Sequence, residues 1–256
     1  MTHGLVYQVA GVLENTIPLG LSAVLPDGSA PEEYQRTQQE VCKVMMVLGR
    51  YPHARSMMVD KGAVPSLVFC LRSAANLETR YIAMDALGLI ASGGPLLARS
   101  VADAGAMEPL GEMLWTSSYV KSAQALAVLS GCGQAAAQRS WDSGADALVE
   151  ILVNKDDNIG RQAALSAFCA MSQWGEGAQE TTTSRRKGEP RPLSETLANA
   201  TFVHGALLEM IEDIFRDRHS PPAMASTACE TLLNLWRHQA ALGTYSTNSD
   251  LSQVTS

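Results

Sequence analysis

The sequence predicts an all-α solenoid, a stack of short helices built from repeated units. Two observations indicate this fold. A phrase that begins with Gly-Ala returns at Gly62, Gly105 and Gly144, at intervals of 43 and 39 residues, close to the period of roughly 40–47 residues found in stacked two- and three-helix repeats. The composition agrees, because 46% of the residues are hydrophobic and only 5% are aromatic, which suits packed helices better than a sheet. We therefore expect one continuous array of repeats.

Each repeated phrase is expected to separate two short helices. Its glycine follows a short apolar segment, and glycine can close a helix in the left-handed conformation without a Cβ clash. Pro65 and Pro109 stand about three residues after Gly62 and Gly105, where proline is tolerated because first-turn amides have no intrahelical partner. By analogy, we expect one helix to end and another to begin at Gly144.

A third helix is expected after each phrase. Its pattern is Ala-x-x-Ala-Leu, with apolar side chains at i, i+3, i+4 and i+7, which marks one buried helical face. Copies of this pattern lie at 81–90, 122–129, 164–171 and 228–235, and the helix expected at 32–48 shares it.

These residues resemble the armadillo repeat, whose signature is a Gly-Ala-x-Pro-x-Leu-Val phrase followed by Ala-x-x-Ala-Leu-x-Asn-Leu. The resemblance covers about residues 35–239, and Asn234 stands at the asparagine of the signature. In the other units that place is held by Val47, Leu89, Val128 and Ala170. The resemblance implies a right-handed α-solenoid of armadillo-like three-helix repeats, an α-α superhelix.

Taken in order, the chain divides into five expected parts. Residues 1–31 form N-terminal capping helices and a loop, 32–172 armadillo-like repeats, 173–200 an inserted loop of disordered composition, 201–242 the last repeat, and 243–256 a flexible C-terminal tail. A degenerate repeat is an equal alternative for the first part. The basic residues of the insertion, Arg185, Arg186, Lys187 and Arg191, are interpreted as a solvated loop, with a docking or nuclear-import tag as the alternative.

Composition and motifs argue against several classes of function. A net charge of −7 and five cysteines without a Cys-x-x-Cys pair predict no nucleic-acid partner, no metal site and a reducing compartment, the cytoplasm or alternatively the nucleus. Glu14, Asn15 and Pro18 interrupt the apolar stretch at 4–25, so no membrane span is expected. No local motif joins a nucleophile, a base and an orienting group, and we expect neither a cofactor nor enzyme activity.

The resemblance implies a concave groove whose walls are the third helices and which contacts an extended partner. Aligning the units predicts a row of contact residues that differ in charge and polarity, namely Lys43, Tyr81, Asp85, Gln124, Ser166, Glu230 and Asn234. The row lacks the Trp-x-x-x-Asn ladder of nuclear-import adaptors, because Glu230 stands four places before Asn234. The tryptophans are scattered instead and are expected to pack in the core or in loops.

Two functions fit this groove. The first is a non-catalytic scaffold or adaptor that binds an extended peptide or a partner domain of a protein whose identity the sequence does not specify. The alternative is a chaperone cofactor, since short armadillo-like solenoids resemble nucleotide-exchange factors that clamp the nucleotide domain of a heat-shock chaperone. The size of the chain matches this alternative, but no specific motif does.

Overall fold

The computed structural model describes residues 32–154, 156–175, 201–216 and 222–253, and the regular structure of these residues is helical. Its helices are α2 (Glu32–Gly49), α3 (Pro52–Asp60), α4 (Ala63–Ser73), α5 (Leu77–Ala91), α6 (Pro95–Asp103), α7 (Met107–Met113), α8 (Tyr119–Ser130), α9 (Gln134–Val153), α10 (Asn158–Ser172), the 3₁₀ turn η1 (Gln173–Gly175), α12 (Thr201–Arg216) and α13 (Pro222–Gln253). The capping helices expected at 1–31 and most of the insertion expected at 173–200 lie outside the described residues.

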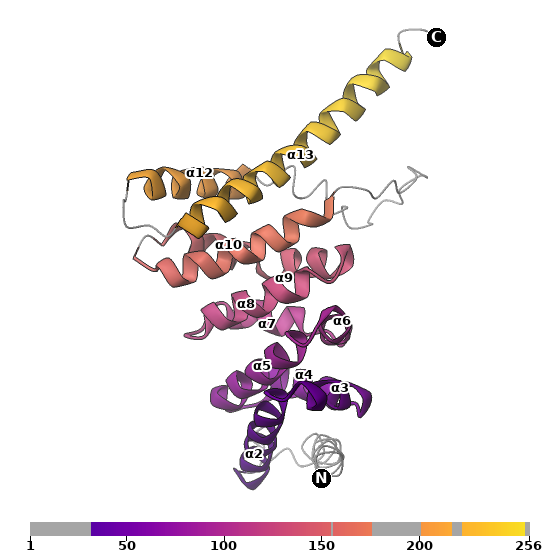
Figure 1. Ribbon diagram of the computed structural model, residues 1–256, viewed down its shortest axis with the longest axis vertical. Helices are drawn as coiled ribbons and strands as arrows, with labels where there is room; N and C mark the ends of the chain where they lie inside the picture. Colours follow the sequence, from indigo (N-terminus) through magenta and orange to yellow (C-terminus); the bar gives the residue numbers. More distant parts are fainter. Residues whose placement is uncertain (1–31, 155, 176–200, 217–221, 254–256) are drawn as a thin grey trace, which may run out of the picture.

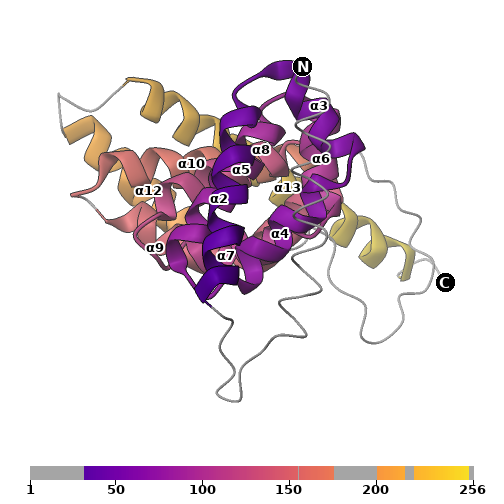
Figure 2. The ribbon, with the colours of Figure 1, turned by 90° about the horizontal axis from the view of Figure 1, so that it is seen from below.

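The helices stack from α2 at one end to α13 at the other (Figure 1). Helices of the same kind contact one another along the stack: α3, α6 and α9 as first helices, then α4, α7 and α9 as second helices. The third helices α2, α5, α8, α10 and α13 form the longest of these rows. Seen along the stack, α3 and α6 lie together on one side of α2, α5 and α8 (Figure 2). The predicted α-solenoid is confirmed.

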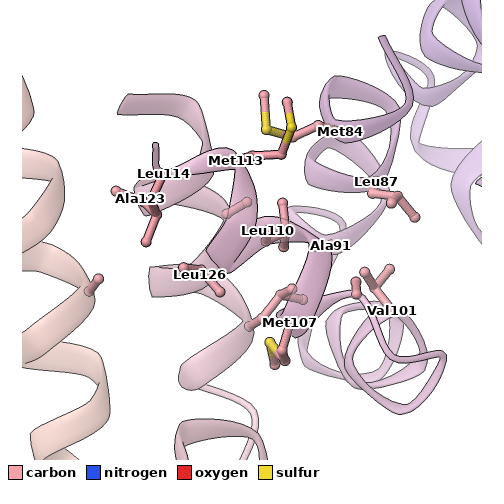
Figure 3. Packing of buried hydrophobic residues seen from close by; sticks show 14 of the residues in the cluster. Met84, Leu87, Ala91, Val101, Met107, Leu110, Met113, Leu114, Ala123 and Leu126 are labelled. Carbon is pink, nitrogen blue, oxygen red and sulfur yellow. The ribbon is translucent and has the colours of Figure 1, made fainter. Parts of the chain in front are cut away.

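The core runs between these rows and consists of leucine, methionine and alanine side chains. Figure 3 shows a section of it in which side chains of α5, α6, α7 and α8 meet; Met84, Leu87, Val101, Met107, Leu110 and Leu126 are each at most 1% exposed. Full burial of one such side chain contributes about 1.5–3 kcal/mol. Each repeat therefore gains its stability from its neighbours, as expected of a solenoid.

Two of the repeated phrases separate helices as predicted. Gly62 and Gly105 have φ values of 74° and 84°, in the left-handed region that glycine enters without a Cβ clash. Pro65 and Pro109 follow in the first turns of α4 and α7. Glycine ends one helix, and proline fits where the next begins.

The helix break expected at Gly144 is wrong, because this residue lies inside the continuous helix α9. Gly144 serves close packing instead. A Cβ atom there would come within 2.9 Å of Leu114 Cδ1, and a Cβ on Gly111 would run into the backbone of Ser143. The two glycines let α7 and α9 approach each other, so the third repeat fuses its first and second helices into one.

Equivalent residues at the start of three third helices tie each repeat to the next. Arg80 Nη2 lies 3.1 Å from a carboxylate oxygen of Glu112 in α7. At the matching place of α8, the hydroxyl of Tyr119 donates to Asp157 at 2.6 Å. At the matching place of α10, Arg161 Nη2 lies 3.5 Å from an oxygen of Asp213 in α12. Each contact crosses from one unit into the following one.

The last helix is longer than the sequence predicted. Residues 243–256 were expected to form a flexible tail, but α13 continues to Gln253, and its distal part projects beyond the stack (Figure 1). From Thr244 to Gln253 the sequence holds neither glycine nor proline, so no residue there terminates the helix.

Candidate functional site

The third-helix face, defined as the solvent-facing side of α2, α5, α8, α10 and α13, carries the residues predicted to contact a partner. Each of them is partly or fully exposed: Lys43, Tyr81, Asp85, Gln124, Ser166, Glu230 and Asn234. None of the seven side chains is buried, so all seven are accessible to a partner. Their surroundings differ along the row.

A hollow of about 400 Å³ opens on the third-helix face across α2, α5 and α8. Its lining is mainly apolar with a few polar groups: Met46, Arg50, Met84, Asp85, Gly88, Leu89, Ser92, Lys121, Gln124, Ala125 and Val128. Of the predicted row, the hollow brings together Asp85 and Gln124. Its volume can accept one or two side chains of a bound peptide.

The charge of Asp85 is balanced within the hollow. Lys121 Nζ lies 2.6 Å from Asp85 Oδ2 and joins α8 to α5. Both side chains remain partly exposed, so this ion pair adds little stability. The ion pair has a larger effect on ligand recognition. Because Lys121 already binds Asp85, this carboxylate is not a free acceptor for a basic ligand.

Two residues of the predicted row, on α2 and α5, lie outside the hollow. Tyr81 forms a 2.9 Å hydrogen bond with Ser117, and this bond lowers the pKa of the Tyr81 hydroxyl. Lys43 lies 2.9 Å from Glu40 on its own helix, and that hydrogen bond raises the pKa of Lys43. Both polar groups already have partners within the protein.

The other three residues lie along α10 and α13, away from the hollow. Ser166 donates to the carbonyl oxygen of Gln162 at 2.8 Å, within its own helix. The amide of Asn234 donates to Ser172 Oγ at 3.3 Å and so links α13 to α10. Glu230 is exposed on α13. The structure therefore does not gather the predicted row into one site.

Comparison with known proteins supports the fold. No protein-family profile matches the sequence. An engineered protein matches with a TM-score of 0.60 and 22% identity over 78% of this chain, which spans 44% of that protein. A designed armadillo repeat protein in complex with the peptide (KR)4 matches with a TM-score of 0.57 and 18% identity, over 90% of this chain and 99% of the other. The chain has the armadillo-repeat fold.

A natural protein shows the same likeness. The armadillo-repeats-only protein of Plasmodium falciparum matches with a TM-score of 0.58 and 13% identity, over 78% of this chain and 80% of the other. The armadillo solenoid is thus shared with both designed and natural chains.

Sequence reasoning missed Met46, Arg50 and Lys121, which line the hollow of this armadillo solenoid. The alignment followed one row of residues four apart, whereas the hollow also takes in the flanks of each third helix. Lys121 was detectable, because it stands one turn before Gln124 and 36 residues after an aspartate. A search for opposite charges one repeat apart would have found the pair.

The tryptophans of the armadillo solenoid do not all pack as expected. Trp141 is buried, and its ring meets Phe168 edge-on with the ring centroids 5.8 Å apart. Trp115 lies in the turn between α7 and α8, as the loop expectation allowed, but it is 63% exposed. Trp236 is 66% exposed on α13, so the expectation of core or loop packing is wrong for this residue. Large exposed aromatic side chains often mark interaction sites.

The described residues offer no arrangement suited to a metal ion, since no group of three or more His, Cys, Asp or Glu side chains is placed to hold one. Among these residues, no helix combines the length and apolar character that a membrane crossing requires.

Proposed function

We propose that this protein is a non-catalytic scaffold that binds an extended peptide segment of a partner protein in the groove of its third helices. The hollow across α2, α5 and α8 carries this proposal. It spans three successive third helices, so one extended segment can contact all three.

The chemistry of the hollow suits a segment with an apolar anchor. Met46, Leu89 and Val128 supply an apolar lining that is at least partly exposed, and methionine adapts its shape to different side chains. Gln124 at the rim offers both donors and an acceptor to the backbone of a peptide. Recognition of this kind combines one buried anchor with hydrogen bonds to the peptide main chain.

The designed armadillo neighbour in complex with (KR)4 supports peptide binding by this fold. The same preference for basic residues is not expected in this hollow, because Lys121 already balances Asp85. We propose instead that the hollow selects an apolar side chain within the segment. No feature of the described residues favours the chaperone-cofactor alternative.

The test is selection of peptides from a displayed random library, followed by affinity measurement on variants. Gly88 lines the hollow, and no atom lies within 4 Å of the place where its Cβ would stand. Gly88→Leu should fill the hollow without disturbing the core. We expect it to weaken the selected peptides about tenfold, which corresponds to about 1.4 kcal/mol.

Gly205→Leu on α12 is the matched control, since Gly205 also has open space at its Cβ but lies away from the hollow. Melting temperatures of both variants should stay close to that of the parent chain. Equal affinities of the parent and Gly88→Leu for every selected peptide would place the binding surface elsewhere and refute the proposal.

A further inference from the structure

Trp115 forms an exposed apolar platform outside the third-helix face. It lies in the turn after α7, and 63% of its surface is accessible. Two hollows lie beside it, and both are lined by Trp115 and Ala147. One extends over Ile151 and Asn154 and the other over Trp141 and the middle of α9. Neither shares a lining residue with the hollow across α2, α5 and α8.

Three carboxylates of α9 follow the edge of this platform. Asp142 and Asp146 line one of the hollows, and Glu150 lines the other. They are four residues apart, so they occupy one face of the helix, and like charges at this spacing destabilise it. None of the lysines and arginines that the structure describes forms an ion pair with them.

We propose that the Trp115 platform and the carboxylate stripe of α9 are a second docking site, which binds an extended, arginine-containing segment of a partner protein. A guanidinium group stacks on an indole ring and also binds carboxylates through two parallel hydrogen bonds. The platform offers both partners side by side. Binding of arginine would also relieve the repulsion between the carboxylates.

The spacing of the stripe defines the kind of segment. Residues four apart on a helix are separated by about 6 Å along its axis. Alternate side chains of an extended chain are separated by about 6.6 Å on the same side. An Arg-x-Arg-x-Arg segment lying along α9 can therefore direct successive guanidinium groups to Glu150, Asp146 and Asp142.

The experiment measures binding of a fluorescently labelled (KR)4 octapeptide, in which every second residue is arginine, by fluorescence anisotropy. Octalysine of equal charge is the second probe. We expect (KR)4 to bind at least about fivefold more tightly than octalysine, because lysine does not stack on indole in the same way. Trp115→Ala and the double variant Asp146→Asn/Glu150→Gln should each weaken (KR)4 about tenfold.

Three controls distinguish binding at the platform from binding elsewhere on the chain. Trp236→Ala removes an equally exposed tryptophan on α13, and Glu32→Gln/Glu33→Gln removes two exposed carboxylates from α2. Gly88→Leu fills the third-helix hollow. All three should leave the affinity for (KR)4 unchanged.

Several outcomes would overturn the proposal. Loss of binding in Gly88→Leu would assign the basic peptide to the third-helix groove. Equal weakening by the α2 control would show that only the net charge matters. Equal affinity for octalysine, or no binding of (KR)4 to the parent chain, would also reject an arginine site at Trp115.

Discussion

Gly111 and Gly144 show how one missing side chain decides the distance between two helices. We predict that Gly111→Ala destabilises the protein by about 2–3 kcal/mol, because its Cβ meets the backbone of Ser143, which cannot move aside. Gly144→Ala should cost about 1 kcal/mol, since the nearest atom is the flexible end of Leu114. Denaturant titration followed by circular dichroism measures both values.

The control for these substitutions is Gly88→Ala. Gly88 lies inside α5 with open space at its Cβ, so alanine should stabilise the helix by about 0.5–1 kcal/mol. A loss of stability in Gly88→Ala as large as that in Gly111→Ala would contradict the packing role of Gly111.

The hydrogen bond between Tyr119 and Asp157 should make stability depend on pH at both extremes. The bond lowers the pKa of Asp157 and raises that of Tyr119. The contribution of Asp157 is therefore present above the ordinary carboxyl pKa of about 4 and is lost as the pH falls through the lower folded value. The contribution of Tyr119 is present below about pH 10 and is lost as the pH rises through the higher folded value.

Tyr119→Phe should cost below about 1 kcal/mol between pH 5 and 9, because the pair is partly exposed. This difference should shrink toward zero in more acidic and more alkaline solution. Unfolding titrations across the pH range measure it. Tyr81→Phe is the control, since its partner Ser117 does not titrate in acid. A Tyr119→Phe difference that stays constant down to pH 2 would disprove the role of the Asp157 carboxylate.

At the same scale, sequence reasoning succeeded where proline accompanied glycine and failed where it did not. Gly62 and Gly105 are each followed by a proline, and both have positive φ. Gly144 begins a similar phrase without proline, and it lies inside a helix. The phrase alone did not distinguish a glycine needed for a turn from one in a continuous helix. The nearby proline did.

At the scale of elements, an arginine near the start of two third helices, α5 and α10, fastens each of them to the helix before it. Arg80 Nε donates to the carbonyl oxygen of Leu71 at 2.7 Å, and Arg161 Nε donates to that of Leu152 at 3.1 Å. Their side chains are 21% and 6% exposed. The same hydrogen bond from arginine to a carbonyl oxygen thus occurs in two repeats, and the arginine is more deeply buried in the second.

We predict that Arg161→Lys destabilises the protein by about 2 kcal/mol and Arg80→Lys by about 1 kcal/mol or less. Lysine keeps the charge but loses the fork of donors that reaches the carbonyl and the carboxylate together. The cost is larger at Arg161 because its side chain is more deeply buried. Thermal and denaturant unfolding measure both. A larger loss in Arg80→Lys would contradict this ordering.

The third helices were predictable as elements, but the site they form was not. The Ala-x-x-Ala-Leu pattern reports the buried face of a helix, and it located α5, α8 and α10. What lies on the opposite face depends on side chains that meet across repeats, such as Asp85 and Lys121. The exposure of Trp115 likewise depends on how α7 packs against α9, which no local pattern contains.

At the scale of the whole molecule, we expect each part of the stack to have its own local stability. The chain should not unfold as a single unit. In a solenoid each unit contacts only its neighbours, so weakening one interface should affect the units beside it most. Helix α12 contacts α9 and α13, and Leu207 is fully buried there. Leu87, at the other end of the described stack, is buried in α5.

We predict that Leu207→Ala lowers the protection of amides in α12 and α13 from hydrogen exchange about thirtyfold or more and leaves α2, α4 and α5 nearly unchanged. A buried Leu→Ala substitution costs about 2–5 kcal/mol, and 2 kcal/mol corresponds to about a thirtyfold change in the local opening equilibrium. Leu87→Ala should show the reverse pattern, with the loss centred on α2, α4, α5 and α8. Exchange followed by mass spectrometry of peptic peptides measures both. If each variant lowers protection equally in every helix, the chain unfolds as one cooperative unit and the nearest-neighbour description fails.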